Sequence, residues 1–397
     1  MSGRADMDVE EDQEEVAPEQ VPDLTICKRA FVVYTGRGTS VDYDAVMSTI
    51  KEKKMGPWYS ILCSMHPAQF KLDQAVLKEC EESNAATLKK IEEECEEAIK
   101  DAGDMEILDA MFAKARHFAR IGDKAAAFTS YGAILERPKI STGKKIDAEM
   151  ERARVALFHH DLPAFKEAVD SAKKLIELGG DWDRRNRLKV YEAMYLITCR
   201  DMKAAAELLL ESVATFTCVE LFDYKQFVFY LTVTSVLSLP RTTLKKRIVD
   251  GPEVLSVMPE MPVLDALVHS LYECEYKRLM NAMVDLNEQL LDDRYFGKHT
   301  RYIIREMRIL SYTQFLDAYK SVILSSMAQA FGVGDEFLDA ELSRFIAAGR
   351  LNAKIDKVEG VIETNRPDKK NAQYHSSIAK GDMLLNKIQK LARLVVV

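Results

Sequence analysis

The stretch Asp335–Thr364, DEFLDAELSRFIAAGRLNAKIDKVEGVIET, predicts a helix followed by a β-hairpin. Its first part, Asp335–Ala348, has helical character, with Asp335 as a candidate N-cap and Gly349 as its stop. Leu351–Ile355 then alternates apolar and polar residues, which is the period of a strand. After a turn at 356–360, Val361–Thr364 can return as the second strand.

Two further helices are expected before this stretch, at Tyr302–Tyr319 and Ser321–Phe331, with a turn at Gly332–Gly334. Three helices followed by a hairpin is the order of a winged helix.

Upstream, three turns predict a helical repeat. They lie at Ile121–Asp123, His159–Asp161 and Cys199–Asp201, and their aspartates are 38 and 40 residues apart. Each Asp can cap the helix that follows. The spacing is typical of degenerate tetratricopeptide-like (TPR-like) helix pairs, which bury their faces only by stacking into a solenoid.

The segment before the repeats is expected to be helical. Leu24–Val33 and Tyr43–Ser64 form a pair around the turn Thr35–Ser40, and Leu72–Ala102 forms a long charged helix. Its thin apolar stripe fits an exposed arm across a neighbour, a helix packed along one seam, or an ordinary surface helix. The stripe comprises Val76, Leu77, Leu88, Ile91, Cys95 and Ile99.

Beyond the repeats, Glu220–Leu290 continues as helices broken at prolines 240, 252, 259 and 262. The long apolar stretch Phe227–Leu239 falls short of a membrane span and predicts a buried helix, so no membrane association is expected.

A final helix is predicted from about Ser376 to Leu394. Its apolar residues recur every three or four positions, and basic residues lie beside them. This stripe favours packing on other chains over docking back on the winged helix. It comprises Leu384, Leu385, Ile388, Leu391 and Val395.

The formal net charge of -8 resides in the first 23 residues, which carry nine acids and one base. Such a run predicts a disordered tail. The seven cysteines are odd in number, scattered and without a C-x-x-C pair, which indicates reduced thiols in the cytoplasm or nucleus. The acidic start does not fit a signal peptide.

Motifs of catalysis are missing from the sequence. Gly143-Lys144-Lys145 lacks the hydroxyl of a phosphate loop, and His159-His160 are adjacent where metal-binding pairs need helical spacing. H-E-x-x-H and G-x-S-x-G are absent. We therefore expect no enzyme activity, no catalytic residue, no cofactor and no metal.

Nucleic-acid binding is the main rival to protein binding, because winged helices often bind DNA through their third helix and wing. Residues 341–397 carry eleven bases and six acids. The third helix, however, holds four acids against Arg344 alone, and phosphates would repel it. We expect no nucleic acid as a partner.

Several runs resemble PCI-domain proteins, and more closely the family of the non-ATPase lid subunit numbered seven in the regulatory particle of the 26S proteasome. The resemblance extends from about Ile107 to the C-terminus. The runs that carry it are Gly179–Tyr191, Phe331–Val333, Glu341–Leu351, Lys354–Val358 and Glu363–Asp368. Within the first run, Asp181–Arg187 fits a salt-bridged turn between repeats better than a partner contact.

The resemblance implies a mainly α fold, with a TPR-like solenoid, a winged-helix (PCI) module and a C-terminal bundle helix. The expected parts are residues 1–23 (acidic tail), 24–104 (helical arm), 105–300 (repeats), 301–368 (winged helix) and 369–397 (bundle helix).

It also implies a structural subunit in a hetero-oligomer, in cytoplasm and nucleus. Its partners would be other PCI-domain lid subunits, the zinc isopeptidase lid subunits and the ATPase base. The wing edge strands and the stripe of the final helix would be the contacts. The wing-edge residues are Leu351, Ala353, Ile355, Val361 and Glu363. Alternatives are a signalosome PCI subunit and a nucleic-acid-binding initiation factor subunit.

Overall fold

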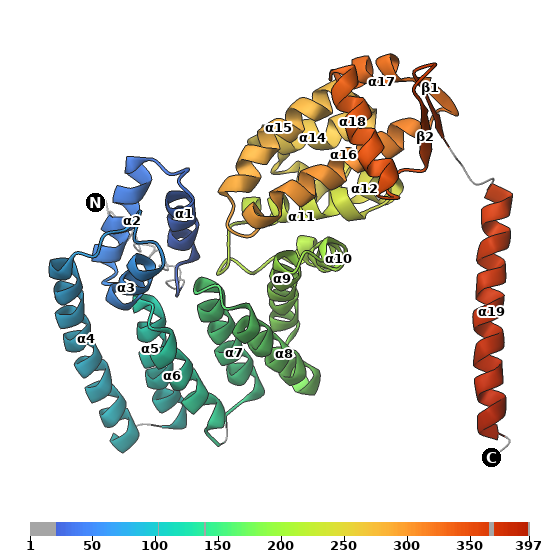
Figure 1. The fold of residues 1–397 in the computed structure, drawn as a ribbon. Coiled ribbons are helices and arrows are strands. Elements are labelled where there is room, and N and C mark those ends of the chain that lie inside the picture. The colour runs from blue at the N-terminus through green and yellow to red at the C-terminus, as the bar shows by residue number, and fades with distance from the viewer. Residues whose placement is uncertain (1–20, 102, 139, 365–368, 396–397) are drawn as a thin grey trace, which may run out of the picture. The chain divides into compact units, whose positions relative to one another are not determined.

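The computed structural model describes residues 21–101, 103–138, 140–364 and 369–395, and nearly all of its regular structure is helical (Figure 1). The chain divides into two compact units. One comprises Met1–Phe227 and Asp292–Tyr295, and the other comprises Val228–Leu291 and Phe296–Val397. The predicted mainly α fold is confirmed. The five-part division drawn from the sequence stays a prediction beside these two units.

The first unit is a series of helices in which each member from α4 to α10 packs on the next (Figure 1). This is the stacking that a helical-repeat array requires, because one pair alone cannot bury its apolar face. The helices are α1 Leu24–Tyr34, α2 Ser40–Glu52, α3 Gly56–Met65, α4 Gln74–Asp101, α5 Asp104–Ile121, α6 Lys124–Glu136, α7 Thr142–Phe158, α8 Leu162–Gly179, α9 Trp182–Thr198, α10 Met202–Ser212 and the short 3₁₀ turn Val213–Thr215.

The three predicted turns join α5 to α6, α7 to α8 and α9 to α10, and they share one hydrogen-bond pattern. The residue before each Asp is left-handed, with φ of 77°, 57° and 68°. The Asp amide donates to the carbonyl five residues earlier, at 2.9 to 3.0 Å. The Asp side chain accepts from the amide three residues later, at 3.1 to 3.2 Å. The predicted caps Asp123, Asp161 and Asp201 are therefore confirmed.

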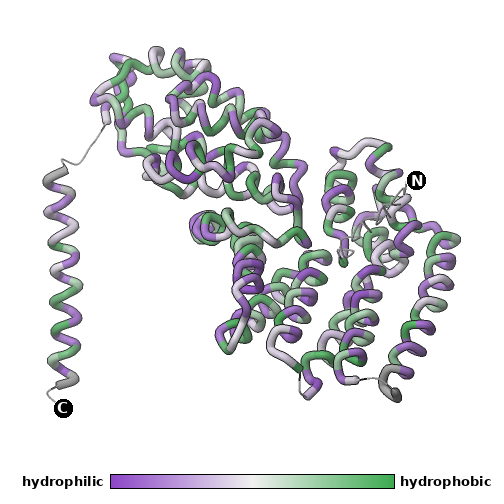
Figure 2. The backbone as a smooth tube through the Cα atoms, turned by 180° about the vertical axis from the view of Figure 1, so that it is seen from behind, coloured by the Kyte–Doolittle hydropathy of each residue, from purple (hydrophilic) through white to green (hydrophobic). Residues whose placement is uncertain are grey.

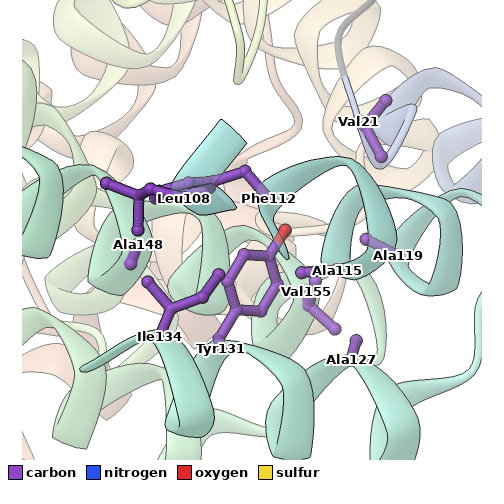
Figure 3. Packing of buried hydrophobic residues seen from close by; sticks show 10 residues of the cluster. All are labelled: Val21, Leu108, Phe112, Ala115, Ala119, Ala127, Tyr131, Ile134, Ala148 and Val155. Atoms are coloured by element: carbon purple, nitrogen blue, oxygen red, sulfur yellow. The ribbon is translucent and has the colours of Figure 1, made fainter. Parts of the chain in front are cut away.

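The core between α5, α6 and α7 shows why small residues recur in these helices. Figure 3 shows the ring of Tyr131 among Phe112, Ala115, Ile134 and Val155. Ala115 and Ala127 are completely buried, and the absence of a larger side chain lets neighbouring helices approach closely.

The last residues of the predicted acidic tail take part in the fold around α1, so the predicted tail extends too far along the chain. Val21 is buried with the core of α5–α7, and Asp23 caps α1 by accepting from the Thr25 amide at 2.9 Å. Asp23 also pairs with Lys53 at 2.7 Å. The rest of the predicted tail, residues 1–20, lies outside the described residues.

The segment predicted as one helix, Tyr43–Ser64, is two helices. The helical conformation is interrupted between α2 and α3, where Lys54 has a left-handed backbone conformation with φ 54°. Pro57 sits in the first turn of α3, where its missing N–H has no helical acceptor to satisfy. Of the three interpretations of the long charged helix, packing along a seam is the one observed: α4 packs on α3 and α5, and Lys114 of α5 pairs with Glu92 at 2.8 Å.

The remaining elements lie mainly in the second unit, and their boundaries follow the expected proline breaks. Pro252 and Pro262 are the first residues of α13 and α14, and Pro240 precedes α12. The apolar stretch of α11 is buried without interruption from Phe227 to Val236, as predicted. The helices are α11 Tyr224–Ser238, α12 Arg241–Leu244, a π turn Lys245–Val249, α13 Pro252–Leu255, a 3₁₀ turn Met258–Glu260, α14 Pro262–Glu273, α15 Tyr276–Asp292, a 3₁₀ turn Gly297–His299, α16 Thr300–Leu316, α17 Leu324–Phe331, α18 Asp335–Ala347 and α19 Lys369–Val395.

The sheet of this unit corrects two expectations about the winged helix. Three strands, β1 Ser321–Ile323, β2 Ala353–Asp356 and β3 Val361–Thr364, pair in the antiparallel order β1-β3-β2. The prediction of a helix from Ser321 was wrong for its first three residues, which form β1. The prediction of Val361–Thr364 as an edge strand was also wrong, because β3 is the middle strand and pairs on both sides. The N-cap of α18 is Gly334 rather than Asp335.

The cap of α8 generates a prediction about pH. Asp161 pairs with Lys124, which lowers the pKa of its carboxyl below the usual range. Asp161→Ala removes both cap and charge and should reduce the free energy of unfolding by about 1 kcal/mol. Asp161→Asn keeps a good cap and should cost less, since an exposed ion pair contributes little. Urea titrations measure both changes.

The deficit of the Asn variant should depend on pH. Because the folded-state pKa is lowered, the charge stabilises the fold above the unfolded pKa of about 3.9 and stops doing so as pH falls through the folded value. Wild type and Asp161→Asn should therefore converge in acid. Equal destabilisation by Ala and Asn at every pH would contradict the capping role.

Candidate interaction surfaces

The apolar stripe of α19 is exposed in the isolated chain. Leu384, Leu385, Ile388 and Leu391 have exposed fractions between 53% and 63%. The side chain of the fifth predicted residue, Val395, lies outside the described residues. Apolar and polar residues alternate along the helix (Figure 2).

The sequence interpretation began this stripe too late in the chain. Tyr374, Ile378 and Met383 are also exposed, with fractions of 61% to 66%. Tyr374, Ile378, Leu385 and Ile388 follow one another at intervals of four, seven and three residues, so the helical period itself could have found them. An apolar seam along α19 is thus available to another helix.

The five predicted wing-edge residues are not equivalent in the structure. Leu351 and Ala353 are buried, so their side chains belong to the core of the unit. Ile355 and Val361 are half-buried, and Glu363 is exposed. Leu351 precedes β2, and Val361 and Glu363 lie in the middle strand.

The strand register shows which backbone groups remain open. Thr364 donates to the Lys320 carbonyl at 2.9 Å, and Leu324 donates to the Gly360 carbonyl at 2.8 Å. Because hydrogen-bonded pairs alternate in an antiparallel ladder, Val361 and Glu363 direct their backbone groups toward β2.

On β2 these groups meet Asp356 and Lys354, so the N–H and C=O of Ala353 and Ile355 point outward. By the same alternation, the backbone groups of Ser321 and Ile323 face away from the sheet on β1. Within the described residues, the sheet thus has two open edges. The β-branched pair Val322-Ile323 was the sequence signal for β1.

Within each unit, buried carboxylates connect helices by accepting hydrogen bonds from both an arginine and a tyrosine. In the first unit, Glu151 accepts from Tyr131 at 3.0 Å and from Arg116 at 2.7 Å. Glu220 accepts from Tyr191 at 3.3 Å and also pairs with Arg187.

The second unit repeats the arrangement. Glu341 of α18 accepts from Tyr312 at 2.9 Å and from Arg308 at 2.8 Å, both of α16. Burial first, and the adjacent carboxylate second, raise the pKa of Tyr131 and Tyr312 far above the usual range. These titratable groups hold helices together, so their shifted pKa values have a structural cause.

The tract Asp181–Arg187 also has a structural role. Asp181 is the N-cap of α9, and Arg184 donates two hydrogen bonds of 2.8 Å to Asp147 of α7. The expected salt-bridged turn between repeats is confirmed.

Two side chains of the types used in metal binding and nucleophilic chemistry, His159 and Cys274, have shifted pKa values. Burial, with help from Lys124 and Arg294, lowers the pKa of His159 to about 4. Within the described part of the chain, no three His, Cys, Asp or Glu side chains are arranged to hold a metal ion. Burial would raise the pKa of the Cys274 thiol, but hydrogen bonds from Tyr276 and Gln314 outweigh it and lower the pKa. Among the described residues, no histidine lines the cavity beside Cys274 to act as a base.

None of the described helices combines the length and the apolar character that spanning a bilayer demands.

Three protein families match successive parts of the chain. The family described as 26S proteasome subunit RPN7 matches residues 73–247, and the PCI domain matches residues 283–366. The family described as the RPN7/PSMD6 C-terminal helix matches residues 373–395, which is nearly all of α19.

Curated relatives align over most of the chain. A 26S proteasome non-ATPase regulatory subunit 6 homolog of Arabidopsis thaliana is 44% identical over 350 residues, covering 88% of this chain and 90% of the relative. The subunit 6 of Dictyostelium discoideum is 41% identical over 377 residues, with 95% and 98% covered. The regulatory subunit RPN7 of Saccharomyces cerevisiae is 36% identical over 417 residues, with 97% of each covered.

The chain belongs to the RPN7/PSMD6 family of 26S proteasome regulatory subunits. The resemblance drawn from the sequence is confirmed. The resemblance of this chain to the family also begins earlier than Ile107, since the match to the RPN7 family starts at residue 73.

The exposure of α19 predicts a neutral effect on the stability of the free chain. Leu384→Asp combined with Leu391→Asp should leave the thermal unfolding midpoint within about 2 °C of wild type, because exposed substitutions rarely change stability by more than about 0.5 kcal/mol. Ile362→Asp, at a completely buried position of β3, is the positive control and should lower the midpoint sharply. If the unfolding midpoint of the α19 variant falls as far as that of this control, the stripe packs within the chain.

Proposed function

We propose that the chain is a non-catalytic scaffold in the lid of the 26S proteasome regulatory particle and supports ATP-dependent degradation of ubiquitinated proteins. Membership of the RPN7/PSMD6 family carries the proposal. The exposed stripe of α19 and the open edges of the winged-helix sheet supply surfaces through which such a subunit would assemble.

The proposed partners are other PCI-domain lid subunits, the zinc isopeptidase lid subunits and the ATPase base. In this hetero-oligomer, α19 joins a helix bundle, and β2 continues into a neighbour by strand addition. Cytoplasm and nucleus are the proposed compartments. A signalosome subunit or an initiation factor subunit is not favoured, because the relatives are named as proteasome subunits.

The bundle contact can be tested with the α19 variant. Leu384→Asp with Leu391→Asp places two charges in an apolar seam, where desolvation would oppose helix association. Native purification of the tagged variant should recover few lid subunits compared with wild type. Lys380→Ala, which lies on the same helix and removes no apolar side chain, is the control and should assemble normally. Normal incorporation of the double variant would exclude the stripe from the bundle.

The strand contact can be tested on the outward backbone of β2. Ile355→Pro removes an N–H that points away from β3, so it should spare the sheet and weaken pairing with a neighbouring strand. Ile355→Ala loses more side chain but keeps the N–H, and it should assemble better than the Pro variant.

Quantitative mass spectrometry of co-purified subunits would measure the assembly of both variants, and the thermal midpoint of the free chain would check their folding. If Pro and Ala assemble equally while both remain folded, β2 does not pair with a neighbour.

A further inference from the structure

A cavity of about 710 Å³ in the second unit is lined by residues of α15, α16 and α18 and of the segment that follows α18. Five guanidinium groups line it, and the single carboxylate among its lining residues is that of Glu341. Glu306, on α16, lies just outside the lining and engages two of the arginines. The arginines are Arg301, Arg305, Arg308, Arg344 and Arg350.

Three of these arginines are engaged by the two carboxylates. Arg308 pairs with Glu341 at 2.8 Å. Arg305 pairs with Glu306 at 3.1 Å, and Arg350 reaches both oxygens of the same carboxylate. Five positive charges against two negative charges leave a local excess of three.

The other two arginines carry this excess. Across the described residues, no carboxylate comes within 4 Å of Arg301 or Arg344. Arg344 makes a hydrogen bond to the Ala340 carbonyl at 3.1 Å through Nε, which leaves its terminal nitrogens as donors. Both side chains are exposed, so a ligand can reach them.

We propose that this cavity binds a compact polyphosphate anion, a role separate from the scaffold function. Guanidinium groups donate paired hydrogen bonds to phosphate oxygens, and several phosphates joined together concentrate enough charge to engage several arginines. The volume falls within the range of small-molecule sites, about 300–1,000 Å³.

An extended nucleic-acid strand fits this surface less well than a compact anion. The first turns of α18 carry Asp335, Glu336 and Asp339, so a backbone that runs along the helix from the cavity would meet negative charge. A compact ligand can remain at the far end of α18, beside Arg344 and Arg350.

The test is calorimetric titration of the full-length chain with sodium triphosphate at low ionic strength. Arg301→Ala with Arg344→Ala should weaken binding by about a hundredfold, since each lost charge-assisted contact costs about tenfold. Both residues are exposed and free of ion pairs, so the variant should fold. Lys246→Ala with Arg247→Ala removes the same charge from exposed positions outside the cavity and should bind as wild type does.

A second variant should change affinity in the opposite direction. Glu306→Gln keeps the size of the side chain, removes a negative charge and frees Arg305 and Arg350 for the ligand. It should bind triphosphate several-fold more tightly than wild type.

Three probes define the ligand class. Triphosphate and inositol hexakisphosphate should both bind through Arg301 and Arg344, and the tighter one identifies the phosphate arrangement that fits. Citrate, which carries three carboxylates without phosphate, should bind more weakly than triphosphate. The proposal fails if triphosphate does not bind, if the two Ala double variants lose affinity equally, or if citrate matches triphosphate. It also fails if single-stranded RNA binds more tightly than triphosphate through the same arginines.

Discussion

The structure depends on one constraint, which is that an amphipathic helix pair cannot bury its apolar face without the next pair. From α4 to α10 each helix packs on the next. Two kinds of contact fix this stacking. Small residues such as Ala115 and Ala127 set the distance between helices. Carboxylates such as Glu151 and Glu220 fix the alignment, because each needs an arginine and a tyrosine at defined positions.

The same solution appears at the winged helix. Arg308, Tyr312 and Glu341 have the sequence spacing of Arg187, Tyr191 and Glu220, and both sets bring a later carboxylate onto a donor pair one helical turn apart. Removing one partner from such a cluster leaves a buried charge uncompensated, which costs more than the intact cluster contributes. The clusters therefore specify which helices pack together more than they add net stability.

Local chemistry decided which parts of the fold could be predicted. The helix caps Asp123, Asp161 and Asp201 could be predicted because an N-cap depends only on neighbours within a few residues of the sequence. β1 was missed because Ser321–Ile323 becomes a strand only when β3 lies beside it, some forty residues later. The middle position of β3 could not be inferred for the same reason. For the α19 stripe, periodicity predicted the apolar face and favoured packing on other chains, and the structure shows that this face is exposed in the isolated chain.

The position of β3 has a consequence for symmetry. A sheet with its last strand in the centre presents two unlike edges, β1 on one side and β2 on the other. A two-fold dimer pairs an edge with itself and leaves the other edge open. Contacts between unlike edges are heterologous, and they extend from subunit to subunit until the arrangement closes or is ended by different surfaces. Pairing through both edges would therefore place the module between two neighbours that it contacts in different ways.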